Sequence, residues 1–99
     1  MQFRQGDVFI EQVDGLPPGA ERLHGPIILA EGEATGHAHR VSNRLAKFFQ
    51  AANGERFLVV KRRTAVEHEE HDPVALSPGT YQVKRQREYS PEEIRNVAD

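Results

Sequence analysis

Residues 47–60 read KFFQAANGERFLVV and carry the clearest structural signal in the chain. Two apolar runs flank Asn53-Gly54 in this stretch, and both of these residues tolerate left-handed backbone dihedrals. An Asn-Gly pair between apolar runs is the strongest short-range signal for a β-hairpin. The stretch therefore predicts two antiparallel strands joined by a tight turn.

The segments before this hairpin also have strand character. Residues 7–13 are rich in β-branched and aromatic side chains, and residues 27–30 form a short apolar run suited to a buried strand. Gly32 and Gly36 predict a turn or bulge just before residues 37–41, where an alternating pattern resumes. We expect three strands in this half of the chain.

The segments after the hairpin continue the strand pattern. Residues 57–66 are expected to form a strand, and residues 74–76 and 81–83 flank Pro78-Gly79, a further turn of the hairpin type. Short strands with turn signals every 8–12 residues are typical of a small barrel or sandwich. We predict a mostly β fold, a small antiparallel β-barrel or sandwich.

The end of the chain has the features of a helix start. Ser90 can cap the helix, Pro91 suits the first helical position, and Glu93 can complete a capping box. Ile94 and Val97 provide a thin apolar stripe. We expect a β domain over residues 1–89 and a short C-terminal helix over residues 90–99, packed on the domain or extending from it.

Length and composition fit one small domain. The chain has 99 residues, no cysteine and a formal net charge of −2. The absence of cysteine excludes disulfides, iron–sulfur clusters and thiolate zinc sites, and fits a cytoplasmic protein. No apolar run is long enough to span a membrane, and the N-terminal segment lacks the apolar core of a signal peptide.

Four of the five histidines form two tight pairs, His37 with His39 and His68 with His71. Alternate residues of a strand share a face about 6.6 Å apart, so His37 and His39 can converge on one metal ion. In a regular strand only one of His68 and His71 could join them, whereas a bulge or helical turn would bring both to one side. We expect a metal site built from His37, His39 and one or both of the second pair.

Carboxylates beside the second pair extend this hypothesis. Glu67 or Glu70 can complete a set of nitrogen and oxygen ligands, which suits Zn²⁺, Fe²⁺, Mn²⁺, Ni²⁺ or Cu²⁺. An open coordination position would permit Lewis-acid chemistry, with Glu69 or Glu70 as general base. Three arginines could then hold a substrate carboxylate or phosphate through bidentate contacts. These arginines are Arg40, Arg62 and Arg85.

Residues 32–39, GEATGHAH, followed by Pro78-Gly79, resemble the two-motif layout of single-domain cupins. In that family a glycine-led HxH supplies two metal ligands, and a later motif with a Pro-Gly turn supplies a third histidine. The resemblance implies a small antiparallel barrel with a central metal held by His37 and His39. The family's glutamate after HxH and its later histidine are both missing here, so the remaining ligand has to come from His68 or His71.

A second resemblance rests on four short segments spread over the chain. QGDV at residue 5, GHAH at residue 36, HEEH at residue 68 and QREY at residue 86 look like those of a group of small uncharacterised bacterial proteins. This resemblance implies a discrete family and attaches no function to it.

Three classes of function remain open from the sequence. The first is an interaction or accessory protein, with a protein partner and a structural or regulatory metal. The second is a cupin-like metal-dependent enzyme acting on a small polar molecule. The third is an RNA- or DNA-binding module in which residues 61–63 (KRR) and 84–87 (KRQR) form one basic patch on adjacent strands. Edge strands or the terminal helix are expected to pair two copies into a homodimer.

Overall fold

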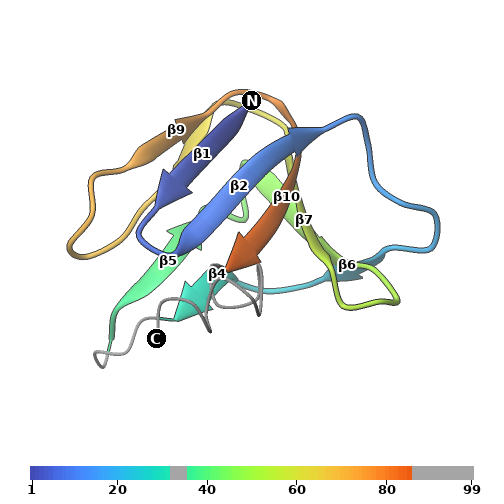
Figure 1. Cartoon of the computed structure of the whole chain (residues 1–99), viewed down its shortest axis with the longest axis horizontal. Helices are drawn as coiled ribbons and strands as arrows, with labels where there is room; N and C mark the ends of the chain where they lie inside the picture. The colour runs from blue at the N-terminus through green and yellow to red at the C-terminus, as the bar shows by residue number, and fades with distance from the viewer. Residues whose placement is uncertain (32–35, 86–99) are drawn as a thin grey trace, which may run out of the picture.

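The structure is a computed structural model that describes residues 1–31 and 36–85 (Figure 1). The described residues are mostly β, as predicted, and contain no helix long and apolar enough to cross a membrane. The expected helix at residues 90–99 lies outside the described residues. The strands are β1 Gln2–Gln5, β2 Val8–Val13, β3 Glu21–Leu23, β4 Ile27–Glu31, β5 Ala38–Val41, β6 Ala46–Gln50, β7 Arg56–Val60, β8 Thr64–Val66, β9 Val74–Leu76 and β10 Gly79–Arg85.

Six of these strands form one antiparallel sheet in the order β1-β2-β10-β7-β6-β3. The other four form two antiparallel ribbons, β4-β5 and β8-β9. An isolated bridge joins the ribbons, because Arg40 and Glu67 exchange two backbone hydrogen bonds of 2.9 Å. Hydrogen bonding among the described strands does not close a barrel.

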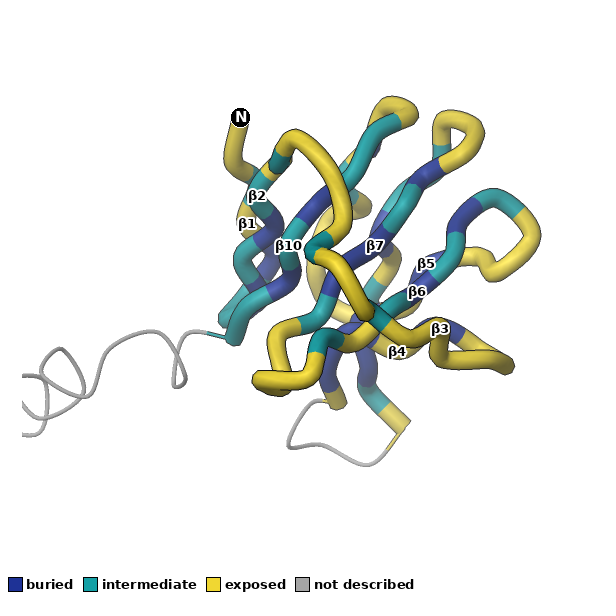
Figure 2. Tube along the Cα trace, turned by 90° about the vertical axis from the view of Figure 1, so that its right-hand side faces the viewer, coloured by how far each residue is buried: buried dark blue, intermediate teal, exposed yellow. Residues whose placement is uncertain are grey.

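The hydrophobic core lies between the six-stranded sheet and the two ribbons. Figure 2 shows buried stretches in the middle of the strands and exposed loops at their ends. Burial of these apolar side chains from both layers is the main stabilising contribution to so small a domain. The six-stranded sheet contributes Val8, Ile10, Phe48, Leu58, Val60, Tyr81 and Val83, and the ribbons contribute Ile27, Leu29, Val41, Val66 and Leu76.

The predicted central hairpin is confirmed, with β6 and β7 paired from Ala46↔Val60 to Gln50↔Arg56. Its turn is longer than a two-residue Asn-Gly turn, because residues 51–55 all lie outside the ladder. Only Gly54 has a positive φ, of 91°, whereas Asn53 uses its side-chain oxygen to accept a hydrogen bond from the Glu55 amide. The asparagine therefore acts here as a local hydrogen-bonding residue.

Two sequence-based strand predictions need correction. Residues 57–66 do not form one strand, because the charged run Lys61-Arg62-Arg63 interrupts the apolar pattern and the chain passes there from the sheet to the β8-β9 ribbon. Pro78-Gly79 does not close a hairpin either: β9 pairs with β8, whereas β10 pairs with β2 and β7. Pro78 has no backbone N–H for a ladder, and it lies where the chain returns to the sheet.

Candidate metal centre

The structure brings all four paired histidines together, although the two pairs come from different segments. His39 lies on β5 and His37 directly precedes that strand, whereas His68 and His71 lie in the connection from β8 to β9. The ring centroids of His39 and His68 are 4.4 Å apart, those of His68 and His71 are 4.6 Å apart, and those of His39 and His71 are 5.9 Å apart. The His37 ring lies 5.7 Å from that of His68. We refer to these four residues as the histidine cluster.

Gln5 fixes the protonation of the innermost histidine. The Gln5 carboxamide is buried at the end of β1, where its Nε2 donates to the carbonyl oxygens of Val66 and Asp72, both at 2.9 Å. Only an NH₂ group can satisfy two carbonyls, so the Gln5 Oε1 must be the atom 2.7 Å from His39 Nδ1. His39 therefore carries its proton on Nδ1, and its Nε2 presents a lone pair to the cluster.

Burial favours the neutral form of His39 as well. Its side chain is 3% exposed. Desolvation by this burial lowers the pKa of His39 below its ordinary value, and the nearby His68, His71 and Arg85 lower it further, whereas Asp7 opposes the shift. A neutral imidazole with a free Nε2 is the form that binds a metal ion.

The tight turn between β1 and β2 lies directly against the cluster. Gly6 has a φ of 59°, and a Cβ placed on it would lie 2.8 Å from His71 Nε2 and 3.4 Å from His39 Cε1. Glycine adopts this left-handed backbone without strain, and any side chain here would require the His71 ring to shift. The next residue, Asp7, has its Oδ1 3.7 Å from His39 Nε2, and its Oδ2 lies 3.4 Å from Arg85 Nη2.

A local hydrogen-bond network holds the β8-β9 connection against the start of β5. Glu69 accepts from the Ala38 amide at 2.9 Å with one oxygen and from the Arg40 guanidinium with the other. These two donors lower the pKa of Glu69 to about 2, the Ala38 bond contributing most. Such a weakly basic carboxylate fits an anchoring role better than that of a general base, whose pKa should lie near the working pH.

The other candidate ligands in the β8-β9 connection make fewer side-chain hydrogen bonds than Glu69. His68 Nδ1 accepts a hydrogen bond from the Glu70 amide at 3.0 Å, so this histidine can ligate through Nδ1 only by giving up that bond. Glu70 itself is mostly exposed, and its Oε2 lies 3.7 Å from His37 Nδ1. Glu67 is occupied at its backbone by the bridge to Arg40.

Two overlapping ligand sets can be drawn from these residues. His37, His68 and Glu69 each offer one ligand atom, and these atoms lie within 4.8 Å of one another. Both carboxylate oxygens of Glu69 already accept hydrogen bonds, however, whereas His39 has an oriented and free Nε2. We favour a second set, which shares His68 with the first. It is centred on His39 and includes His71, with Asp7 as the carboxylate beside His39.

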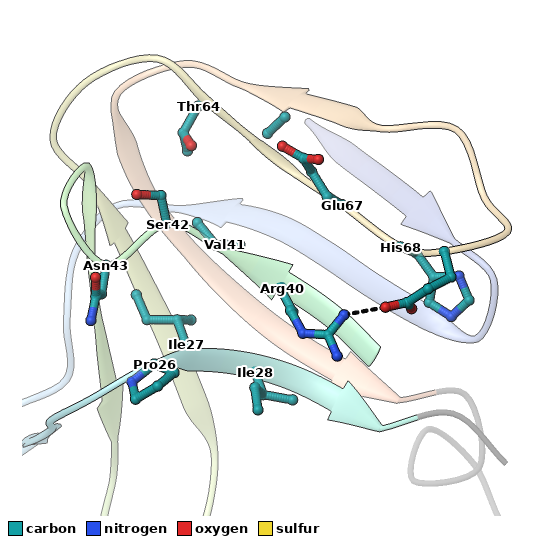
Figure 3. A pocket seen from close by; sticks show the side chains of 12 residues that line it. Pro26, Ile27, Ile28, Arg40, Val41, Ser42, Asn43, Thr64, Glu67 and His68 are labelled. Atoms are coloured by element: carbon teal, nitrogen blue, oxygen red, sulfur yellow. Dashed lines mark hydrogen bonds and ion pairs between the residues drawn. The ribbon is translucent and has the colours of Figure 1, made fainter. Parts of the chain in front are cut away.

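The three arginines predicted to hold a substrate lie in different places. Arg40 lines a groove of about 630 Å³ that reaches from Pro26 and Asn43 to His68 (Figure 3). Its guanidinium contacts Glu69 and also donates to the Gly36 carbonyl. Arg85 lies beside Asp7. Arg62 lines a separate hollow with Arg44 and Leu45.

A family model described as a domain of unknown function, DUF8820, matches residues 4–86. The chain belongs to the DUF8820 family. Comparison with curated proteins and with solved structures found no match.

The DUF8820 match includes three site residues that sequence reasoning did not assign. They are Gln5, Gly6 and Asp7, which precede and form the turn into β2. The sequence pattern predicts Asp7 at the start of a strand and assigns Gln5 and Gly6 no role in a site. What makes Gln5 important is its contact with Val66, 61 residues further along the chain, which no local pattern reports.

Proposed function

We propose that this DUF8820 protein binds a divalent transition metal at the histidine cluster, with His39 Nε2 as the central ligand. The observation that carries the proposal is the bond from His39 Nδ1 to a Gln5 carboxamide that is itself fixed by two carbonyls. Histidines that bind metals typically donate their second ring N–H to such an oriented acceptor, which sets the tautomer and the ring orientation.

The spacing of the rings supports the same proposal. At the usual metal–nitrogen distance of about 2.0–2.1 Å, imidazoles that share one ion have ring centroids roughly 4.5–5.3 Å apart. The His68–His71 separation of 4.6 Å lies in this range and the His39–His68 separation of 4.4 Å lies just below it, whereas His39 and His71, at 5.9 Å, have to approach each other to share an ion. Ligation by His68 would replace its bond to the Glu70 amide. Nitrogen and oxygen donors of this kind suit zinc, iron, manganese, nickel or copper.

A structural or regulatory role suits the position of this site. The β1-β2 turn belongs to the six-stranded sheet, whereas β5 and the β8-β9 connection belong to the ribbons. A metal bound between them would join both layers at one edge of a small core. We therefore infer an accessory protein whose folded state, and any partner surface formed from it, is stabilised by the metal.

The test is metal analysis of untagged protein purified without chelator. We expect about one equivalent of a transition metal, lost in His39→Ala and in His71→Ala, and retained in His24→Ala, since His24 is exposed and outside the cluster. His71 is exposed, so its substitution is expected to leave the fold intact. Zinc at 100 times its Kd should stabilise the metal-free protein by about 2.7 kcal/mol, a rise of 10 °C or more in Tm. Absence of both the metal and this stabilisation would contradict the proposal.

The groove at His68 favours a second candidate function. Its wall residues extend from the histidine cluster towards Ser42 and Thr64. The groove is large enough to hold a small polar molecule beside a metal. A cupin-like metal-dependent reaction is the enzyme alternative. Metal-dependent turnover in a small-molecule screen, lost in His71→Ala, would support it, and tight metal binding without turnover would favour the accessory role.

A further inference from the structure

Six positive residues lie on or directly beside β3, β6 and β7: one on β3, two at or just before the start of β6, and three directly after β7. The Lys61 and Arg62 amides both donate to the Leu45 carbonyl, at 2.8 and 3.3 Å, and so hold the β5-β6 and β7-β8 connections together. The cluster, here termed the basic end, consists of Arg22, Arg44, Lys47, Lys61, Arg62 and Arg63.

The basic end differs from the single patch expected from the sequence. Lys61 follows Val60, which pairs with Gly79, whereas Lys84 follows Val83, which pairs with Arg56 at the other end of β7. At about 3.3 Å per residue, Lys61 and Lys84 are separated by the length of that strand, roughly 17 Å, and residues 86–87 of the second run lie outside the described residues. Besides residues 61–63, the basic end therefore consists of Arg22 from β3, Lys47 from β6 and Arg44 from the β5-β6 connection.

The basic end lacks neutralising acids. Elsewhere, Arg40 pairs with Glu69, Lys84 with Glu11 and Arg85 with Asp7. Within residues 1–31 and 36–85, none of the six cations of the basic end forms an ion pair with a carboxylate. Residues 42–47 and 61–65 contain no Asp or Glu, and Glu21 on β3 alternates with Arg22 and so faces the opposite side of the sheet.

Electrostatic repulsion within the basic end is visible at Lys47. The pKa of the Lys47 ammonium is lowered, first by the adjacent Lys61 side chain and its positive charge and then by the positive charge of Arg22. Crowded positive charges with no internal counter-charge create a field that attracts a polyanion.

An aromatic ring lies within the same surface. Phe48 packs into the core, so its neighbour Phe49 faces the other side of the sheet and is only partly buried. Phe49 lies directly opposite Arg22 in the β3-β6 ladder, and Lys47 is two residues away on the same face. Surfaces that bind single-stranded nucleic acid combine cations for the phosphates with such rings for stacking bases.

We propose that the basic end binds single-stranded nucleic acid, with phosphates on its lysines and arginines and a base against Phe49. This site is distinct from the histidine cluster and needs no metal.

The test is fluorescence anisotropy of a fluorescein-labelled single-stranded 12-mer, measured in EDTA at several salt concentrations. Lys47→Gln/Lys61→Gln removes two phosphate contacts, so the slope of log K against log salt should decrease by about 1.4. We expect at least a tenfold loss of affinity at low salt. Lys84→Gln is the matched control, because Lys84 pairs with Glu11, and it should change affinity less than twofold.

Three results would overturn the proposal. The first is equal binding by the wild type and the double variant, with Tm values confirming that both are folded. The second is equal weakening by Lys84→Gln. The third is tighter binding of poly-glutamate or of duplex DNA than of the single strand. Phe49→Leu should weaken oligonucleotide binding while leaving retention on inorganic polyphosphate unchanged, and the opposite pattern would exclude stacking.

Discussion

The substitution Gly6→Ala tests whether the β1-β2 turn shapes the histidine cluster. The new Cβ would lie 2.8 Å from His71 Nε2, so that ring has to withdraw by about half an ångström to restore ordinary van der Waals contact. Metal–ligand distances tolerate only about 0.2 Å, so the ring can no longer ligate without further rearrangement. We expect zinc affinity, measured by competition with a chromophoric chelator, to fall about tenfold or more, equivalent to about 1.4 kcal/mol.

Gly19→Ala is the matched control for backbone strain. Gly19 also has a positive φ, of 80°, but a Cβ there would have nothing within 4 Å. Each substitution places a side chain in the left-handed region and should lower the free energy of unfolding by about 1–2 kcal/mol in urea denaturation. Only Gly6→Ala should weaken zinc binding. Equal zinc affinities for the two variants would refute the proposed role of the turn.

Three further predictions follow from single contacts. Gln5→Leu leaves two carbonyls and His39 Nδ1 without their partner, so unfolding free energy should fall by about 2–4 kcal/mol in urea, and a loss below 1 kcal/mol would contradict this. The folded-state pKa of Glu69 is about 2 against an ordinary 4.5, so its stabilisation is present above pH 4.5 and is lost as pH falls towards 2. Thermal melts over that window should show a flatter pH dependence for Glu69→Gln than for the wild type, and identical profiles would exclude the effect. Tyr81→Phe removes the 2.7 Å bond to the Ser77 carbonyl and should cost about 1 kcal/mol, whereas unchanged stability would show that water replaces this bond.

Local sequence patterns predicted much of the fold because the signals for strands and turns are local. The β6-β7 hairpin was evident from its apolar runs and Asn53-Gly54. The turn or bulge predicted between Gly32 and Gly36 lies mostly outside the described residues, and the register shift between Ile28 and Ala30 was not predicted. The β1 strand was missed because QFRQ has a single apolar residue, Phe3. Pro78-Gly79 was misassigned because a turn signal does not tell which strands pair across it.

The candidate site was predictable only in part. Histidine spacing identified all four members of the cluster and left open whether both His68 and His71 could join His39. The irregular backbone between β8 and β9 brings both rings near it. Gln5 and Asp7 could not be found this way, since their role depends on the β1-β2 turn lying against β5.

The most direct test of the metal site is ¹⁵N NMR of the histidine rings, first in EDTA and then with one equivalent of Zn²⁺. The structure predicts that His39 is protonated at Nδ1 before metal is added, and that its Nε2 resonance shifts strongly on binding while Nδ1 stays protonated. A His39 ring protonated at Nε2 in EDTA, or ring resonances that zinc leaves unchanged, would contradict a metal centre built around this histidine.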